Sequence, residues 1–393
     1  MIYFIILFLL IILAVRYDIN GKTKYRDQWY HVILVIFILV AGLRFRVGTD
    51  TPVYIYHFYH ATPVLWDIRI DSILTGGAPP LWVLLLSTVK TIGGKFFWVQ
   101  LIQATIVNTL ILKYFKKHSS YPFACVVVYF LWRYLWYNTV VMKSALAVCI
   151  ILFANDYFLE KKYKKGFLLI LLATGFHQSS ILMLITPFML FLRLNMLGVF
   201  VLVCTYFIGM ILQSMLGDVF QLLAFSDGVY NKLDSYLDDP LYTSQIHNLN
   251  YFIARVFPVI IYPIISLLYV KCKCKDSHIL RLEPFVMMGL VMQMMQFNIH
   301  IFYRFVSIYS AYYILFGVEF FFDLSKSSLV LERSLSYVRS LIIILPLLAS
   351  FAYSYPFTRY DFYPYSSIID KRVYKAREMV YSERVPRRIM DEY

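Results

Sequence analysis

The sequence predicts an all-α integral membrane protein, a polytopic bundle of about 11–13 transmembrane helices. Hydrophobic residues make up 60% of the 393 positions, aromatic residues make up 19%, and only 15% are charged. The mean hydropathy is +0.66. A soluble domain could not bury so much apolar surface. We therefore expect a single polytopic domain over residues 1–355, followed by a polar, tyrosine-rich tail over residues 356–393.

Roughly a dozen apolar runs of nearly or fully spanning length recur along the chain. The first begins beside Met1 with no basic stretch before it, which predicts a retained helix rather than a cleaved signal peptide. The runs cover residues 2–15, 30–43, 79–93, 96–112, 121–137, 139–159, 166–192, 196–215, 250–270, 283–299, 301–322 and 340–355.

The basic clusters between these runs set the predicted orientation, because cytoplasmic loops are rich in Lys and Arg. On this rule the two long polar segments, residues 44–78 and 216–249, are external loops. The number of membrane crossings puts both loops outside only if the run 166–192 breaks at Gly175–Ser179 into two short helices with their turn outside. Between residues 79 and 112, two apparent spans must count as one or as three, and the sequence leaves both open. The clusters expected in the cytoplasm are residues 16–26, 113–118, 161–165, 271–281 and 326–339.

With this topology, a set of cationic side chains lies at the outer ends of the spans. Charge at membrane depth is costly, so such residues indicate a functional site. Long cationic side chains near helix ends also serve as simple interfacial anchors, and that alternative applies to each residue taken alone. Their gathering on the face opposite to the other basic clusters favours a site. The set is Arg44, Arg46, Arg133, Lys143, His177, Arg255 and Arg304.

The chemistry of this set indicates what it holds. The excess of 37 Lys and Arg over 23 Asp and Glu does not predict nucleic-acid binding, because the basic residues lie in short clusters between apolar runs. Guanidinium groups meet phosphate oxygens bidentately, which fits a lipid diphosphate at the outer leaflet. Acidic residues there are scarce: Asp50, Asp67 and Asp71. We therefore expect neither a metal nor another cofactor, with Arg and Lys neutralising the diphosphate instead.

Several segments resemble the motifs of the EpsG/Wzy-type polysaccharide polymerases. Residues 41–54, AGLRFRVGTDTPVY, resemble the stretch R-x-R-x-G-x-D-x-x-x-Y that follows the second helix of that family. Lys143 stands where the family has an Arg before a small-residue helix, so the charge is kept but the planar fork is lost. The sequences KKYKK at 161–165, FHQSS at 176–180 and YRFVSIY at 303–309 resemble its cytoplasmic turn, its Phe-His-x-Ser element and its late Arg-Phe helix.

The resemblance implies a GT-C-like polymerase of the bacterial cytoplasmic (inner) membrane that builds O-antigen, capsule or exopolysaccharide. Such an enzyme transfers a growing glycan from undecaprenyl diphosphate onto the next lipid-linked repeat unit at the outer face. The implied partners are undecaprenyl-diphosphate-linked oligosaccharide repeat units and the lipid membrane, with a chain-length regulator and a flippase as further candidates. An O-antigen ligase or another lipid-linked glycosyltransferase would use the same chemistry and stays an alternative.

The candidate residues take the following roles. Arg46 and Arg304 are the first candidates for binding the diphosphate, with Arg44, Lys143 and Arg255 in support. Interfacial anchoring is the alternative for each of them.

The other candidates are a histidine, an aspartate and two tyrosines. His177 is a candidate general base, since an ordinary histidine pKa of about 6.5 suits that task near neutral pH; the alternative is a histidine that orders its turn or donates to phosphate. Asp50 is either a second base candidate or a partner that holds Arg46. Tyr54 and Tyr309 are candidates for stacking on sugars, although with 34 tyrosines in the chain packing is the alternative for both.

Two other classes compete with the polymerase. A flippase or other transporter for lipid-linked oligosaccharides should place its cations in a central cavity reachable from both sides, and here they lie near one face. A membrane O-acyltransferase with a thioester donor should open to the cytoplasm, whereas the predicted topology places His177 outside.

Overall fold

The computed structural model describes residues 2–69, 78–214, 259–273, 278–299, 302–325 and 362–382. Helix is the regular secondary structure of these ranges, which also contain one isolated bridge between Arg44 and Ser367. The predicted all-α fold class is confirmed. Five described helices are long and apolar enough to cross a membrane, as judged by length and composition: Ile2–Ile19, Phe96–His118, Met142–Leu159, Met196–Gln213 and Tyr303–Phe322. The predicted loop 216–249, the predicted run 340–355 and Arg255 lie outside the described residues.

The helices follow the predicted apolar runs closely. The first part of the chain forms α1 (Ile2–Ala14), η1 (Val15–Ile19), α2 (Arg26–Gly42), α3 (Thr51–Tyr56), η2 (His57–Ala61), η3 (Leu65–Asp67), α5 (Pro80–Thr91) and α6 (Phe96–His118). The middle forms α7 (Pro122–Tyr129), η4 (Phe130–Tyr134), η5 (Trp136–Val140), α8 (Met142–Leu159), α9 (Tyr163–Phe176), η6 (Gln178–Met189) and α10 (Met196–Ser214). The last described elements are α15 (Tyr262–Lys273), η8 (His278–Leu282), α16 (Glu283–Asn298), α17 (Tyr303–Ser325) and α19 (Lys375–Ser382).

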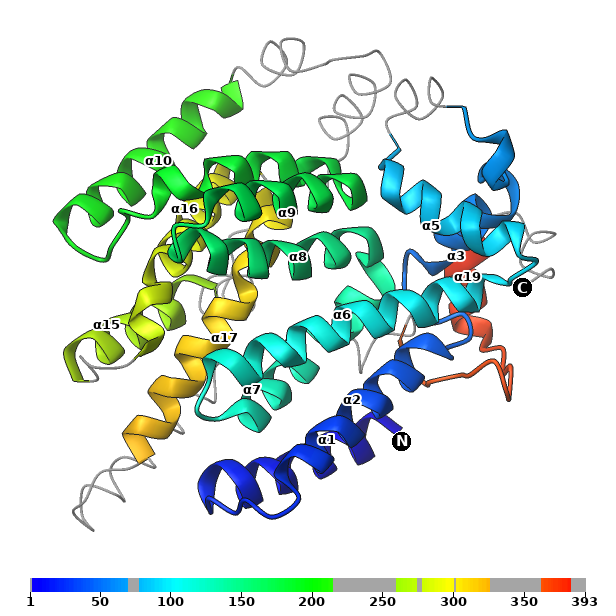
Figure 1. The fold of residues 1–393 in the computed structure, drawn as a ribbon, viewed down its shortest axis with the longest axis horizontal. Helices are drawn as coiled ribbons and strands as arrows, with labels where there is room; N and C mark the ends of the chain where they lie inside the picture. Colours follow the sequence, from blue (N-terminus) through cyan, green and yellow to red (C-terminus); the bar gives the residue numbers. More distant parts are fainter. Residues whose placement is uncertain are drawn as a thin grey trace.

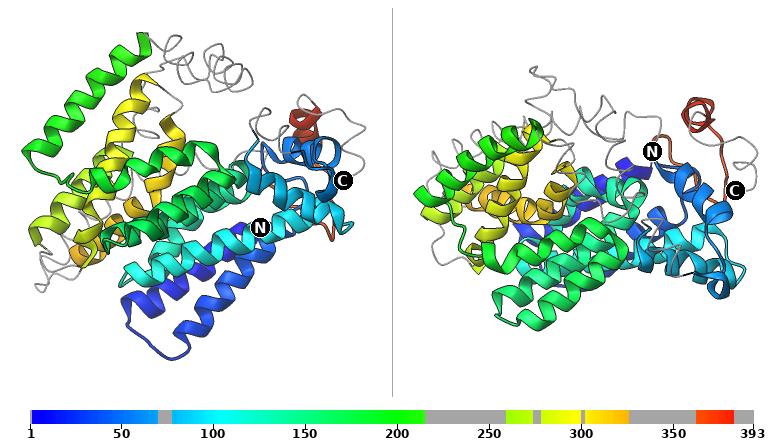
Figure 2. Two further views of the ribbon diagram at one scale, coloured as in Figure 1. Left: turned by 45° about the horizontal axis from the view of Figure 1, so that its top comes forward. Right: turned by 90° about the horizontal axis from the view of Figure 1, so that it is seen from above.

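The helices pack as a bundle with two distinct ends. Figure 1 shows α2 and α6 running side by side, and α3, α5 and α19 gathered at one end of the molecule, far from α15. The views in Figure 2 agree that α19 lies beside the segment that follows α2. Residues far apart in the sequence therefore meet at the end where α2 finishes.

α5 bears on the number of membrane crossings between residues 79 and 112, which the sequence left open as one or three. This helix has 12 residues and is about 18 Å long, well short of a hydrocarbon core of about 30 Å. The Lys90 ammonium donates to the backbone carbonyls of Tyr59 (3.0 Å) and Thr62 (2.6 Å), so α5 is fixed to the segment after α3. Of the two predicted runs within residues 79–112, only the second forms a helix of spanning length, α6.

The predicted break at Gly175–Ser179 is confirmed. α9 ends at Phe176, His177 has an extended backbone (φ −151°, ψ 110°), and η6 then begins at Gln178. The run 166–192 thus forms two short helices joined at the histidine. His177 sits at their junction rather than in the middle of a helix.

Several basic clusters predicted to share the cytoplasmic face meet at one end of the bundle. Lys116 at the end of α6 pairs with Asp27 at the start of α2 (2.8 Å). His118 Nε2 lies 2.9 Å from an Asp156 carboxylate oxygen on α8, and its Nδ1 lies 3.2 Å from the Arg281 guanidinium. The clusters 16–26, 113–118 and 271–281 are therefore neighbours, as the orientation rule requires.

The helical stretch between α6 and α8 is irregular. η4 and η5 are π-helical turns, which leave backbone carbonyls outside the regular hydrogen-bond ladder. The Gln103 amide of α6 donates to the Tyr137 carbonyl (3.0 Å), and Asn108 donates to Asn138 (3.0 Å). Buried polar side chains of α6 thus supply hydrogen-bond partners to this irregular segment. Its last residue, Val140, lies at the end of the bundle that holds α3.

Candidate functional site

The site is built on the loop 43–50, which leaves α2 at the end where α3, α5 and α19 gather. Two of its residues have left-handed backbones: Arg46 with φ 48° and Gly48 with φ 111°. A Cβ on Gly48 would lie 2.5 Å from Thr139 Cβ, so the loop is pressed against η5 at a spacing that only glycine permits. The sequence Arg-x-Arg-x-Gly therefore forms a tight turn, and the side chains of Arg44 and Arg46 contact different parts of the structure.

Arg44 and Arg46 have different surroundings. Arg44 is 1% exposed; its guanidinium donates to the Ala41 carbonyl and lies 3.3 Å from Met142 Sδ. Its role includes capping the carbonyl end of α2. Arg46 pairs instead with a carboxylate of α19, with Nη1 3.0 Å from Glu378 Oε2. Asp50 was one candidate partner for Arg46 from the sequence, which showed no sign of Glu378, the carboxylate that Arg46 contacts.

Tyr54 of α3 has three of the predicted site residues in its surroundings: Lys143, Asp50 and Arg304. Its hydroxyl donates to the Val140 carbonyl (3.0 Å), and Lys143 Nζ lies 6.0 Å from the centre of its ring. Burial raises the pKa of Tyr54; the negative charge of Asp50 raises it further, and the positive charge of Arg304 lowers it. Both charged side chains are therefore close enough to act on this hydroxyl.

Arg304 lies in the first turn of α17 and is half-buried. Its Nε lies 3.3 Å from the Tyr303 hydroxyl, and its guanidinium carbon lies 5.7 Å from the centre of that ring. The Tyr137 hydroxyl donates to the Ser307 carbonyl (2.6 Å), one turn further along α17. η5 therefore fixes the start of α17 and with it the position of Arg304.

His177 is connected to this cluster through α5. Its Nδ1 lies 2.6 Å from Ser179 Oγ, so the serine fixes the orientation of the ring. Gly175, two residues earlier, packs against Leu81 of α5, and the next residue, Trp82, packs edge-on against Tyr54 with ring centres 5.7 Å apart. The histidine thus lies at the same end of the bundle as Tyr54, half-buried.

Two further candidates are placed differently from the cluster. Tyr309 is 2% exposed, and its hydroxyl faces the sulfur atoms of Met183 (3.4 Å) and Met288 (3.8 Å). This placement favours the packing alternative over stacking on a sugar. The guanidinium carbon of Arg133 lies 4.4 Å from the Trp132 ring centre, a cation–π contact with the residue beside it.

The structure adds residues that the sequence did not single out. Arg377 and Tyr381 of α19 hydrogen-bond to the carbonyls of Arg46 (3.0 Å) and Gly48 (2.9 Å). Their spacing of four residues, which puts both on one face of a helix, was the available signal. The tail was instead predicted to be a polar appendage, because nothing in its composition shows what it contacts.

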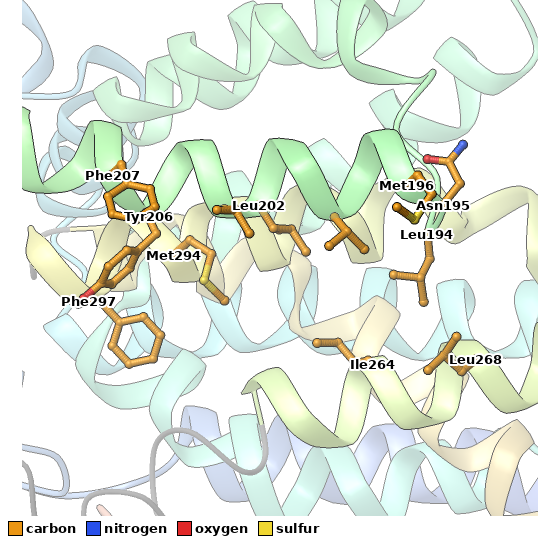
Figure 3. Close-up of a pocket in the computed structure, with 12 residues that line it drawn as sticks. Leu194, Asn195, Met196, Leu202, Tyr206, Phe207, Ile264, Leu268, Met294 and Phe297 are labelled. Carbon is orange, nitrogen blue, oxygen red and sulfur yellow. The ribbon is translucent and has the colours of Figure 1, made fainter.

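An apolar groove of about 1190 Å³ lies elsewhere, between α10, α15 and α16. Figure 3 shows Leu202 and Tyr206 of α10 facing it together with Ile264 of α15 and Met294 and Phe297 of α16. Such a lining suits hydrocarbon rather than phosphate. As for metal ligands, the part of the chain that the structure describes brings together no group of three or more His, Cys, Asp or Glu side chains that could hold an ion.

Comparison with known proteins gives one match. The EpsG family matches residues 27–367, most of the chain. No curated protein and no solved structure matches it. The matched range includes the loop 43–50, His177 and Arg304 and ends at Ser367, before α19 begins.

Proposed function

Because the chain belongs to the EpsG family, a family of Wzy-type polysaccharide polymerases, we propose that it polymerises lipid-linked repeat units in the bacterial cytoplasmic membrane. The growing glycan moves from undecaprenyl diphosphate onto the terminal sugar of the next lipid-linked unit. The reaction takes place at the outer face, where the proposed topology puts the loop 43–50. The products are O-antigen, capsule or exopolysaccharide chains.

The observation that carries this proposal is the convergence of cationic groups on one end of the bundle. Arg46, Lys143 and Arg304 come from three segments that are distant in sequence. Arg46 lies in the loop before α3, Lys143 Nζ lies 6.0 Å from the centre of the Tyr54 ring, and the charge of Arg304 acts on the Tyr54 hydroxyl. Interfacial anchors are not expected to cluster in this way, because each reaches the interface from its own helix end. A diphosphate presents enough oxygens to engage several such groups.

The proposed reaction is a glycosyl transfer without a metal. The acceptor hydroxyl attacks the anomeric carbon of the donor glycan, a new carbon–oxygen bond forms, and the bond to the diphosphate breaks. The diphosphate leaves with the bonding electron pair, and its growing negative charge is stabilised by Arg46 and Arg304 with Lys143 in support. The acceptor proton passes to a base.

His177 and Asp50 are the two candidates for that base. His177 has an orienting partner in Ser179, which is the arrangement of a positioned general base. Asp50 stands at the start of α3, and its backbone carbonyl accepts the hydrogen bond of the Tyr54 amide (3.1 Å). We assign the proton to His177 first, since a carboxylate beside several cations is a weak base.

Arginine-to-lysine substitutions test the diphosphate role against anchoring, because lysine keeps the charge but loses the planar fork. In an assay of purified protein with lipid-linked repeat units, Arg46→Lys and Arg304→Lys should each slow polymerisation by about tenfold or more. The control is Arg16→Lys, an exposed arginine of η1 at the opposite end, which should retain the wild-type rate. Wild-type rates in both site variants would contradict the diphosphate clamp.

A deletion strain separates polymerase from the related activities. Loss of the polysaccharide ladder with one repeat unit retained is the result expected for a polymerase. Loss of every unit would instead indicate a ligase or a flippase.

A further inference from the structure

The described part of the C-terminal tail is bound to the end of α2 over most of its length. The Phe45 amide donates to the Ser366 carbonyl (2.8 Å), and the Ile368 amide donates to the Leu43 carbonyl (2.9 Å). The Tyr365 hydroxyl donates to the Val40 carbonyl (3.1 Å). These bonds place α19 over the loop 43–50.

Contacts to that loop come from Arg377, Tyr381 and Glu378 of α19, and the first two bind its backbone. Arg377 is 1% exposed and bonds the carbonyl of Arg46; Tyr381 is 0% exposed and bonds the carbonyl of Gly48. Both carbonyls belong to residues with positive φ, and at Arg46 a left-handed backbone persists only where its surroundings hold it. Arg377 and Tyr381 therefore fix the corner from which Arg46 leaves.

The third side chain, Glu378, makes a different kind of contact. It touches the functional group of Arg46 itself, through one pair of atoms 3.0 Å apart. Arg46 Nε and Glu378 Oε1 are both buried, yet neither has a hydrogen-bond partner among the described residues. A bidentate arginine–carboxylate pair would use both of these atoms. The contact therefore joins one pair of atoms, between an Arg46 side chain that is 10% exposed and a Glu378 side chain that is 22% exposed.

We propose that Glu378 is an exchangeable counter-ion of Arg46, which a phosphate group of the substrate displaces, and that Arg377 and Tyr381 are positioning residues that hold the loop during the exchange. The proposal rests on the proposed function, in which Arg46 binds the diphosphate. It concerns residues beyond the range that the family matches, which ends at Ser367.

The exchange is physically reasonable in both directions. A guanidinium that is nine-tenths buried is costly without a counter-charge, and Glu378 supplies one. A diphosphate carries more negative charge than a carboxylate and offers oxygens to both Nε and Nη1. The Glu378 side chain is 22% exposed, so the displaced carboxylate has solvent beside it.

The test measures binding of inorganic pyrophosphate to the purified full-length protein by titration calorimetry. Glu378→Gln keeps the size of the side chain but removes the competing charge, so pyrophosphate should bind about fivefold more tightly than to the wild type. The matched control is Glu160→Gln, which removes an exposed carboxylate paired with Lys162 (2.7 Å) and should leave the affinity unchanged. Unchanged or weaker binding by Glu378→Gln would overturn the exchange. Removing a carboxylate tightens pyrophosphate binding only if that carboxylate competes with pyrophosphate for Arg46 in the wild type.

The positioning role has its own matched pair. Tyr381→Phe and Tyr365→Phe each remove one hydroxyl of the tail that bonds a backbone carbonyl, at Gly48 and at Val40 respectively. Both should lower the melting temperature slightly, but only Tyr381→Phe should weaken pyrophosphate binding, by about threefold. Equal affinities in the two variants would overturn the positioning role.

The outcomes also separate this inference from the proposed function. If Arg46→Lys slows polymerisation while Glu378→Gln fails to tighten pyrophosphate binding, the diphosphate clamp stands and the exchange fails. If Arg46→Lys polymerises at the wild-type rate, the clamp fails and the exchange fails with it.

Discussion

Position 48 accepts only glycine, for two independent reasons. Its φ of 111° is strained for any residue with a Cβ, and that Cβ would lie 2.5 Å from Thr139. Gly48→Ala should therefore cost more than about 2 kcal/mol of stability and abolish polymerisation, because the loop that carries Arg46 must move away from η5. Thermal unfolding and a polymerisation assay of the same preparation would measure both effects.

Gly21 provides the control for that substitution. It also has a positive φ, 63°, but a Cβ there would meet nothing within 4 Å. Gly21→Ala should show only the backbone cost of about 1 kcal/mol, with activity retained. Equal losses in the two variants would mean that the contact with Thr139 contributes nothing.

The two roles of His177 can be separated by a glutamine. His177→Gln keeps hydrogen bonding but cannot take up a proton near neutral pH, so a general base should lose a factor of roughly 10² to 10⁴ in rate. Ser179→Ala keeps the imidazole and removes its 2.6 Å partner, so the rate should fall less, by about tenfold. Polymerisation by His177→Gln at close to the wild-type rate would move the base assignment to Asp50.

At the scale of elements, the contact between η5 and α17 positions one of the two main arginines. The Tyr137 hydroxyl bonds the Ser307 carbonyl and lies 2.8 Å from Ser310 Oγ, one and two turns beyond Arg304. Tyr137→Phe removes both interactions, which costs about 1 kcal/mol of stability each. We expect a lower melting temperature and a several-fold lower polymerisation rate, because the start of α17 gains freedom.

A second buried tyrosine shows whether the rate change is specific. The Tyr30 hydroxyl bonds the Leu112 carbonyl (2.8 Å) between α2 and α6, away from α17. Tyr30→Phe should lower the melting temperature in a similar way while the purified enzyme keeps its rate. A drop in rate of the same size in both variants would show that general loosening, and not the position of Arg304, controls activity.

The elements themselves were largely predictable, because apolar runs of spanning length have few alternatives in a membrane. The break at His177 was predictable from the parity of basic clusters alone, and the structure has it at that residue. Whether α5 spans could not be predicted, because its apolar run is close to spanning length. Its contacts with residues 59–65, which fix it at one end of the bundle, are visible only in the structure. The π-helical turns at residues 130–140 left no signal that periodicity could detect.

The site was predictable in part, and the reason is again physical. Arg46, Lys143 and Arg304 could be grouped by face because each follows the end of a span. Their partners could not be identified, because Glu378 is separated from Arg46 by 332 positions and no rule of local spacing connects them. Tyr309 was a candidate because it follows Arg304 closely in the sequence. On α17, however, the separation of five residues places the Tyr309 side chain in the core.

At the scale of the whole molecule, the tail and the loop 43–50 must lie on the same side of the membrane. The bridge between Arg44 and Ser367 and the pair between Arg46 and Glu378 join the two directly. The side of the tail therefore follows from that of the loop. Since the described basic clusters at residues 16–26, 113–118 and 271–281 meet at the other end, we predict that the tail lies outside the cytoplasm.

Cysteine labelling in intact spheroplasts tests this arrangement in a background without the native cysteines. A cysteine in place of His57 in η2 or of Met379 in α19, both exposed, should react with an impermeant thiol reagent. A cysteine in place of Tyr163, which is 44% exposed at the start of α9, should react only after the cells are lysed. Labelling of position 57 but not of position 379 would mean that α19 does not cover the loop in the membrane. That result would also contradict the proposal that Glu378 is a counter-ion of Arg46. Labelling of position 163 in intact spheroplasts would invert the topology and move the cationic site to the cytoplasmic face, where no undecaprenyl-linked polymer is assembled by the proposed reaction.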